Sequence, residues 1–258
     1  MPFRTCALVV PALLLSAGAA SALWSQPAPQ QESQDRAAQA QPGDAQEEGF
    51  IILFDGTEQS AKENWRGFKK QELPEGWTVT EEALTLTGSG QGDIITRQQF
   101  TDFDLRLEWK IEPGGNSGIM YRVGESGDGT DATYLTGPEY QVLDDKDAAD
   151  NKTTMTRAGA LYGLYPAPDP SPVKPAGEWN EARIVVKGNT IEHYLNGEKI
   201  VEAELGSEEW KERLAASKFA TWPRFAKEPS GHIALQDHGN EVAFRNIRIK
   251  RLDAEARP

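Results

Sequence analysis

The sequence predicts an all-β protein, a sandwich or jelly roll of two antiparallel sheets with one short helix. Strand-like runs rich in Val, Ile, Thr and aromatic residues recur at short spacing, and turn-forming Gly and Asn residues separate them. A helical pattern occurs at only one place. The 258 residues suit one large β domain, and seven Trp and nine Phe supply enough bulk for its core.

The first expected strand is the apolar run "FIILF" after Gly49. "WTVTEEALTLTG" is typical of two strands with a short turn between them. Residues Phe103–Pro113 alternate apolar and charged side chains, as a half-buried antiparallel strand does. "NSGIMYRV" (116–123) and "PEYQVLDD" (138–145) are also interpreted as strands.

Hairpins and the helix are expected in the last third of the chain. Gly188-Asn189 and Asn196-Gly197 separate three strand-like runs, which predicts a meander. Residues 231–252, "GHIALQDHGNEVAFRNIRIKRL", predict one more hairpin that turns at Gly239-Asn240. The helix is expected over Ser207–Phe219, because the serine can act as N-cap and two glutamates follow it.

The N-terminal 48 residues differ from the rest. A short basic start, an apolar run too short to span a bilayer and the small residues "AGAASA" predict a secretory signal over residues 1–22. A retained N-terminal anchor is the alternative. Residues 23–48 are rich in Gln, Ala and Pro, which is typical of a disordered linker. The folded domain is therefore expected over residues 49–254.

Removal of residues 1–22 would leave an acidic protein without cysteine. The only cysteine, Cys6, would be lost, so no disulfide, thiol nucleophile or thiolate metal site is expected. Loss of Arg4, one positive charge, would change the net charge from −13 to −14, which disfavours nucleic acid as a partner. The sequence contains no second apolar segment that would suggest stable membrane insertion. The expected location is periplasmic or secreted.

Polar side chains accompany three strands that should be buried. Period-two alternation gives each strand an apolar face for the core and an opposite face with amide, carboxyl, guanidinium or imidazole groups. A merely solvated face more often carries Lys, Glu or Thr. These opposite faces are therefore interpreted as lining a cleft. Their polar residues are Asn116, Arg122, Glu139, Gln141, His232, Gln236 and His238.

Structural interpretations remain open for several of these residues. Arg122 and Glu139 could form an ion pair, and the two glutamines could cap neighbouring backbone. His193 lies between apolar residues and is interpreted as a core histidine, whereas His232 could only close a turn. The acidic stretch 144–151 lacks the Gly and final Glu of an EF-hand loop, which favours a surface loop over a calcium site.

Seven segments of the chain form a recognisable series: "FIILFDGT", "LRLEWKI", "GGNSGIMYR", "PEYQVLDD", "AGALYGLY", "GEWNEARIVVKGNTIEHYLNG" and "GHIALQDHGNEVAFRNIRIKRL". They occur in the order seen in the 3-keto-disaccharide hydrolase domain family, which the chain resembles over residues 49–252. The resemblance implies a concanavalin A-like jelly roll and cleavage of the glycosidic bond of sugars oxidised to the ketone at C3. A 3-keto-disaccharide or other 3-keto-glycoside is thus the expected partner. The insertion Gly124–Thr136, between two of these segments, departs from the family pattern and is expected to reshape the cleft and change the acceptable substrate.

The resemblance also implies site residues, and the chemistry of a 3-keto sugar suggests their roles. The ketone acidifies the proton on C2, so a base can remove it and the resulting enediolate can expel the group at C1. Glu139 or His238 suits the base and Arg122 the electrophile for the enolate oxygen. A divalent metal ion held by His238 and Glu139 is the alternative electrophile. The expected substrate-binding residues are Asn116, Gln141, Tyr162 and Gln236.

Three other functions remain as alternatives. A non-catalytic, lectin-like carbohydrate-binding module would share the fold. A laminarinase-type glucanase would show Glu-x-Asp-x-x-Glu on one strand, but Gln141 replaces the middle acid here. A structural domain of a cell-surface assembly would also be compatible with the linker.

Overall fold

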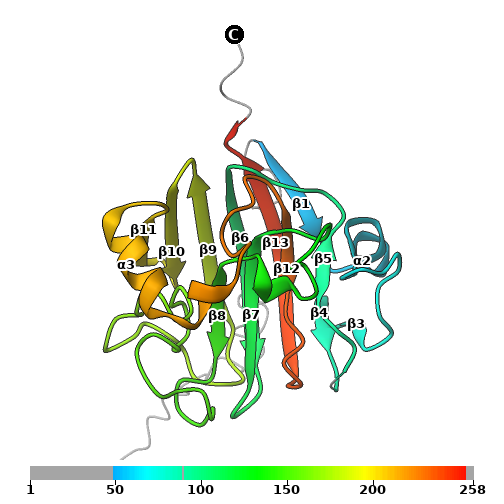
Figure 1. The fold of residues 1–258 in the computed structure, drawn as a ribbon. Coiled ribbons are helices and arrows are strands. Elements are labelled where there is room, and N and C mark those ends of the chain that lie inside the picture. Colours follow the sequence, from blue (N-terminus) through cyan, green and yellow to red (C-terminus); the bar gives the residue numbers. More distant parts are fainter. Residues whose placement is uncertain (1–48, 89, 254–258) are drawn as a thin grey trace, which may run out of the picture. The chain divides into compact units, whose positions relative to one another are not determined.

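The computed structural model describes residues 49–88 and 90–253. The predicted signal (1–22) and linker (23–48) lie outside these residues, as does residue 254. In the described part, two antiparallel sheets pack face to face, with one large cluster of buried apolar side chains between them (Figure 1). Trp65, Trp109 and Phe244 are among its largest fully buried members.

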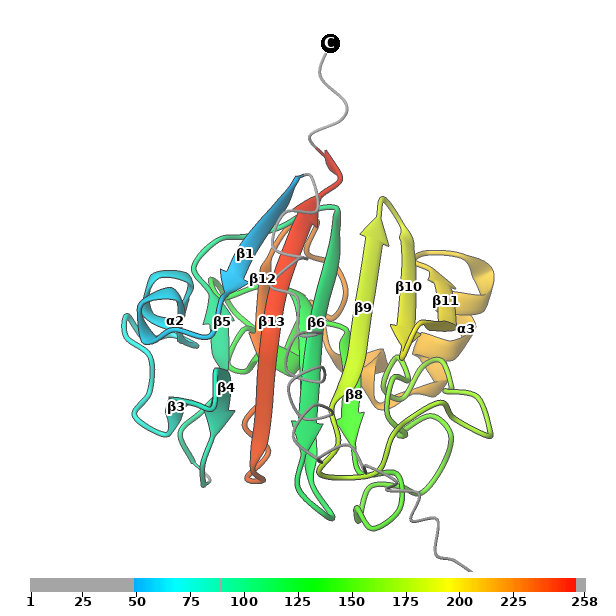
Figure 2. The ribbon, with the colours of Figure 1, turned by 180° about the vertical axis from the view of Figure 1, so that it is seen from behind.

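The larger sheet has eight strands in the order β11-β10-β9-β6-β13-β4-β3, and β1 pairs with β13 (Figure 2). The predicted meander is confirmed as β9, β10 and β11, with positive φ at Gly188, Asn196 and Gly197. The strands are β1 (Phe50–Phe54), β3 (Trp77–Thr80), β4 (Ala83–Leu86), β6 (Phe103–Ile111), β9 (Asn180–Lys187), β10 (Thr190–Leu195), β11 (Glu198–Glu204) and β13 (Val242–Arg251).

The smaller sheet has five strands in the order β2-β5-β12-β7-β8. Antiparallel pairing of β7 with β8 sets Met120 opposite Glu139 and Gly118 opposite Gln141. Tyr140 and Val142 of β8 join the core, so the glutamate and the glutamine lie on the outer face of this sheet, as their alternation predicted. The strands are β2 (Trp65–Gly67), β5 (Ile94–Thr96), β7 (Asn116–Val123), β8 (Glu139–Leu143) and β12 (His232–Leu235).

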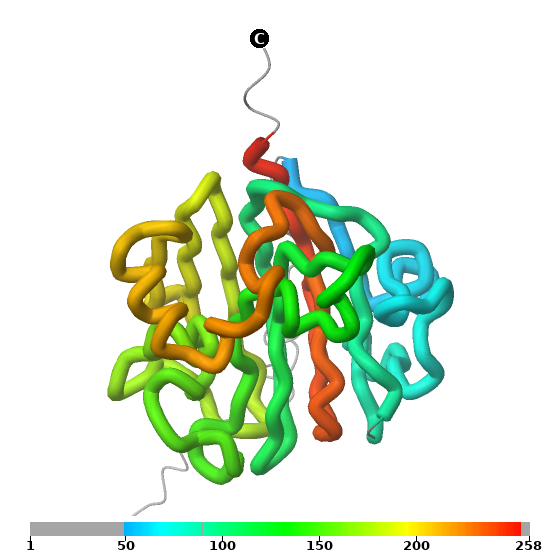
Figure 3. Tube along the Cα trace, in the orientation of Figure 1, coloured from blue at the N-terminus to red at the C-terminus, as the bar shows by residue number. Residues whose placement is uncertain are grey.

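The hairpin predicted over residues 231–252 is wrong. β12 belongs to the smaller sheet and β13 to the larger one, so residues 236–241 cross from one sheet to the other (Figure 3). Both strands carry core residues, but Leu235 reaches the core from one layer and Phe244 from the other. The turn signal at Gly239-Asn240 fixes a local change of direction and leaves the pairing partner open, because pairing is decided by contacts distant in sequence.

The described part contains two α-helices instead of one. The predicted helix is α3 (Glu208–Ala216), and the Ser207 hydroxyl accepts a hydrogen bond from the Trp210 amide at 3.1 Å, as expected of an N-cap. The other, α2 (Glu58–Asn64), is too short to show a helical period in the sequence. Short 3₁₀ turns form at η1 (Thr133–Leu135) and η2 (Lys218–Thr221). No described helix is long and apolar enough to cross a membrane.

Candidate active site

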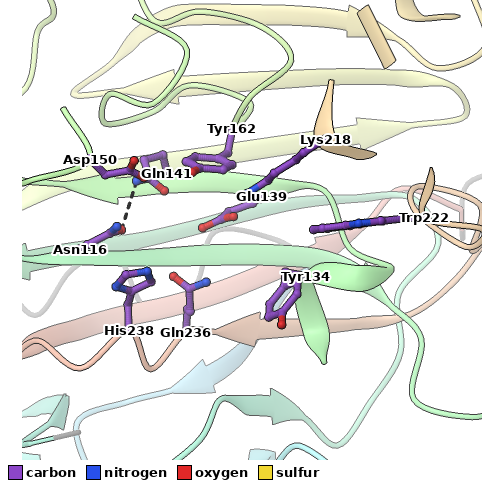
Figure 4. A pocket seen from close by; sticks show the side chains of 10 residues that line it. All are labelled: Asn116, Tyr134, Glu139, Gln141, Asp150, Tyr162, Lys218, Trp222, Gln236 and His238. Atoms are coloured by element: carbon purple, nitrogen blue, oxygen red, sulfur yellow. Dashed lines mark hydrogen bonds between the residues drawn. The ribbon is translucent and has the colours of Figure 1, made fainter. Parts of the chain in front are cut away.

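A cavity of about 270 Å³ is lined by polar and aromatic side chains from the outer face of the smaller sheet and its connecting segments (Figure 4). Six of its ten lining residues are among those that the sequence suggested: Asn116, Glu139, Gln141, Tyr162, Gln236 and His238. The other four are Tyr134, Asp150, Lys218 and Trp222.

Backbone pairing brings the polar residues together. Gln141 lies on β8 beside Asn116 of β7, and its amide nitrogen donates to the asparagine side-chain oxygen at 3.1 Å. The Gln236 amide donates to the Gly118 carbonyl at 3.0 Å, which extends the contact between β12 and β7 past the end of β12. His238 follows in the segment that crosses between the sheets and is exposed at the cavity.

Gly118 makes room for the Glu139 carboxylate. The two residues lie on neighbouring strands and the carboxylate reaches over the glycine. A Cβ at position 118 would lie 2.1 Å from Glu139 Oε1, far inside van der Waals contact. Any larger residue at 118 would therefore displace the carboxylate from its position in the cavity.

Glu139 has the chemical properties of an acid–base group. It is half-buried, and among the described residues no hydrogen bond or ion pair holds its carboxylate. Burial raises the pKa of this carboxyl to about 8; the positive charge of Lys218 opposes the shift, and the charges of Asp93 and Asp150 add to it. A carboxyl with this pKa can accept a proton and return it near neutral pH.

Lys218 supplies a positive charge at the cavity. Its ammonium lies 4.4 Å from the centre of the Tyr162 ring, and it has no hydrogen bond or ion pair within the described part of the chain. The Tyr162 hydroxyl donates to an Asp150 carboxylate oxygen at 3.0 Å. Burial, reinforced by this carboxylate, raises the pKa of the phenol, which therefore stays protonated. The lysine is the group in this cavity best suited to meet negative charge on a ligand.

Two buried amide oxygens at the cavity have no hydrogen-bond partner among the described residues. Gln141 Oε1 and Gln236 Oε1 are both buried and unpaired in the structure. An unpaired buried acceptor costs about 1–3 kcal/mol, so a ligand that donates hydrogen bonds to these oxygens would gain affinity. Hydroxyl groups are suitable donors, because each can offer its proton in one direction and accept in another.

Asp93 joins two segments that carry lining residues. Its Oδ1 accepts the Asp237 amide at 2.9 Å, and its Oδ2 accepts the Thr133 hydroxyl. His238 and Tyr134 are the residues that follow these two partners. The carboxylate therefore fixes both segments behind the cavity.

The expectation that Arg122 faces this cavity is wrong. Arg122 has φ of 51°, and the pairing of β7 with β12 shifts by one residue here, so the alternation is interrupted. Its guanidinium donates to the carbonyls of Thr101 at 3.1 Å and Gly188 at 3.0 Å and pairs with Asp102 at 3.1 Å. Arg122 therefore forms a buried structural ion pair, and its partner is Asp102 and not Glu139.

The remaining histidines lie away from the cavity. His193 is buried in the core, with Nε2 3.0 Å from the Tyr121 hydroxyl and Nδ1 2.9 Å from the Gly159 carbonyl oxygen, which confirms its interpretation as a core histidine. His232 is buried with Nδ1 2.6 Å from the Thr96 carbonyl oxygen. The described residues contain no group of three or more His, Cys, Asp or Glu side chains that could hold a metal ion, so Glu139 and His238 have no third such ligand.

The four residues that sequence reasoning missed lie outside regular strands. Tyr134 belongs to the segment Gly124–Thr136, which was expected only to reshape the cleft, and Asp150 belongs to the acidic stretch 144–151. Lys218 and Trp222 follow α3. The clustering of Trp and Phe between residues 219 and 225 is the one sequence signal that could have pointed to the last of these.

The sequence is similar to known proteins over most of the described residues. Residues 49–250 match the model of the 3-keto-alpha-glucoside-1,2-lyase-like domain. The chain is 38% identical to a protein of Bacteroides thetaiotaomicron named 3-keto-disaccharide hydrolase, over 80% of this chain and 79% of that protein. The predicted resemblance is thereby confirmed.

Solved structures agree on the fold. One from Parabacteroides distasonis, described as a candidate glycosyl hydrolase, has a TM-score of 0.72 at 33% identity and covers 80% of this chain and 94% of its own. A Bacillus subtilis protein described as galectin-like in fold has a TM-score of 0.51 at 10% identity, with 79% and 97% covered. The predicted class, a two-sheet β-sandwich, is confirmed. The chain belongs to the family of 3-keto-alpha-glucoside-1,2-lyase-like domains, the 3-keto-disaccharide hydrolase family.

Proposed function

We propose that this protein cleaves the glycosidic bond of 3-keto-disaccharides and related 3-keto-glycosides. One observation carries the proposal. Glu139, a carboxyl with a pKa of about 8 and no partner among the described residues, shares a cavity with the ammonium of Lys218 and two unpaired amide oxygens. The name of the Bacteroides thetaiotaomicron relative and the word lyase in the description of the family support the choice of substrate and reaction.

The first step removes the C2 proton. The Glu139 carboxylate takes it, and the electrons of the C2–H bond form a C2–C3 double bond while the ketone oxygen becomes negative. Lys218 replaces Arg122 as the group that stabilises this oxygen, because its ammonium is the positive charge at the cavity. Gln141 and Gln236 accept hydrogen bonds from the sugar hydroxyls.

The second step breaks the bond to the leaving group. The ketone reforms, a C1–C2 double bond forms, and the C1–O bond breaks with its electrons going to the leaving oxygen. His238, exposed at the cavity, gives that oxygen a proton. Water then adds its hydroxyl at C1 and its second proton restores His238. C2 receives from Glu139 a proton that has exchanged with solvent, so the net reaction is hydrolysis.

A label at C2 tests this scheme. Wild-type protein should cleave a 3-keto-disaccharide and leave its unoxidised parent intact, and deuterium at C2 should exchange with solvent. Cleavage of both sugars with retention of the label would instead indicate an ordinary two-carboxylate glycosidase, for which Asp150 would be the second acid. Cleavage of neither would overturn the proposal.

A lectin-like module is the second candidate, because Tyr134 and Trp222 offer aromatic surface at the cavity. Binding alone does not require a carboxyl with a pKa of about 8 beside a lysine. Calorimetric titration with the unoxidised disaccharide distinguishes the two: a lectin should bind it as well as the 3-keto sugar and turn over neither.

Asp93→Asn should change the pH dependence of the reaction. The negative charge of Asp93 helps to raise the pKa of Glu139, although burial raises it more. Asparagine removes this charge and keeps a side-chain oxygen that can accept the Asp237 amide. Since the base acts when deprotonated, the rise of kcat/KM with pH should begin at lower pH. The loss of rate at high pH should stay below about tenfold. An unchanged profile would contradict this coupling.

We also propose that residues 1–22 are removed on secretion and that the mature chain begins near Leu23 outside the cytoplasm. The basic start, the apolar run and "AGAASA" support this. Mass spectrometry of material from the periplasm or medium should find no peptide from residues 1–22. A full-length chain in the cell membrane would indicate a retained anchor instead.

A further inference from the structure

The cavity has two chemically different ends (Figure 4). Amide and imidazole groups of Asn116, Gln141 and His238 lie toward one end, and the rings of Tyr134 and Trp222 lie at the other. Glu139 lies between them. Cleavage by the proposed mechanism requires the C2 atom of the oxidised ring at this carboxylate. The two ends must therefore receive the two sides of the glycosidic bond.

The polar end suits the oxidised sugar ring. Its hydroxyl groups can donate to the unpaired Gln141 Oε1 and Gln236 Oε1, which orients the ring and aligns its C2–H bond. The aromatic end instead offers the rings of Tyr134 and Trp222. Apolar ring surface is therefore the main feature that a group bound there can use.

The two rings form a firm surface. Their centroids are 5.7 Å apart, with the ring planes inclined at 48°. Phe219 and Phe225 pack edge-to-face against Trp222 at 4.9 and 6.1 Å and stack on each other at 4.1 Å. Tyr134 remains 44% exposed, so its face is available to a ligand.

Tyr134 is held from behind. It lies in η1, between Thr133, whose hydroxyl bonds to Asp93, and the Leu135 amide, which donates to the Ala132 carbonyl at 3.2 Å. The Ala226 amide donates to the Thr136 carbonyl at 2.8 Å, which joins this segment to the one that carries Trp222. The two aromatic residues are thus fixed relative to one another.

We propose that Tyr134 and Trp222 form the subsite for the leaving group and select 3-keto-glycosides whose leaving group contains a ring, either a pyranose or an aryl group. This proposal rests on the proposed function. One face of a pyranose consists largely of C–H groups, and an aryl ring is apolar on both faces, so either buries apolar area against the aromatic pair. Tyr134 comes from the segment Gly124–Thr136, and Trp222 comes from the segment that follows α3.

Three substrates test the subsite: a 3-keto-disaccharide, an aryl 3-keto-glucoside and methyl 3-keto-glucoside. In Tyr134→Ala and Trp222→Ala, the ratio of kcat/KM for either ring-bearing substrate to that for the methyl glycoside should fall roughly tenfold, mainly through KM. The phenylalanine variants at both positions should keep most of the ratio. Trp179→Ala is the matched control, because this half-buried ring contacts Arg245 and Lys110 on the larger sheet, and its ratio should not change.

Equal losses for all three substrates, or no loss in either alanine variant, would overturn the subsite. Tyr134→Ala keeps the test valid if removal of Trp222 disturbs the packing of Phe219 and Phe225. Failure of the proposed function looks different, since the wild-type protein would then cleave none of the three. Calorimetric binding of the same substrates still decides the matter in that case: weakening confined to the two with rings supports the subsite, and equal weakening refutes it.

Discussion

Replacing Glu139 by glutamine should lower kcat/KM for a 3-keto-disaccharide by about 10²–10⁴-fold and abolish exchange of the C2 proton, because the amide cannot accept that proton. In the wild-type protein kcat/KM should rise with pH until the carboxyl is deprotonated, at about pH 8. Steady-state rates and loss of deuterium, followed by NMR, measure both effects.

Stability provides the control for this variant. Burial raises the pKa of Glu139 above its ordinary value. As pH rises, the unfolded state therefore loses this proton at a lower pH than the folded state does. This carboxyl therefore costs stability increasingly as pH rises from about 4.5 to about 8, and the neutral amide removes that cost. Glu139→Gln should melt at pH 8 at the same or a higher temperature than wild type. A lower melting temperature would attribute the lost activity to misfolding.

Two further variants locate the base more closely. Gly118→Ala leaves the Glu139 carboxylate in the chain but requires it to move, so it should also slow the reaction. His238→Asn should cost less than Glu139→Gln if the histidine serves only the leaving group. Loss of C2 exchange in His238→Asn, with exchange retained in Glu139→Gln, would assign the base to His238. Full exchange in Glu139→Gln would exclude the carboxylate.

Much of the site was predictable because its residues lie on regular strands. Glu139 and Gln141 alternate with Tyr140 and Val142 along β8. Period-two geometry alone therefore assigns the two polar residues to one face of the sheet and the two apolar residues to the other. Arg122 defeated the same reasoning, because a positive φ and a register shift depend on how β12 pairs with β7. The sequence contains no local mark of that pairing.

Strand alternation could not predict the site residues on connecting segments, because their positions also depend on long-range contacts. Lys218, Trp222 and Asp150 reach the cavity from segments without a period, and their positions depend on contacts that join distant parts of the chain. The same holds for β12 and β13, whose separation into two sheets brings Gln236 and His238 to the cavity. The family resemblance supplied Tyr162, which no alternation marks.

Lys218→Met should lower kcat for a 3-keto-disaccharide by about 10²–10³-fold, the loss typical of removing one group that stabilises an oxyanion. Methionine keeps the length and apolar stem of the side chain but not its charge. Since Lys218 also lowers the pKa of Glu139, its loss should move the rise of kcat/KM to higher pH. Lys218→Arg should restore part of the rate by restoring the charge. Lys211→Met on α3, where the lysine pairs with Glu208, is the matched control and should be neutral.

Chelation experiments distinguish Lys218 from the alternative electrophile, a divalent metal ion. If Lys218 stabilises the enolate oxygen, treatment with EDTA should leave the wild-type rate unchanged and Lys218→Met should remain slow when Mn²⁺ or Ca²⁺ is added. If a divalent ion held by Glu139 and His238 does so, EDTA should abolish wild-type activity and Lys218→Met should keep most of its rate. The lysine would in that case act only through the charge it places near Glu139, and its replacement would move the pH profile without lowering the plateau. The plateau rate of Lys218→Met at high pH therefore distinguishes an electrophile from a group that only tunes the base.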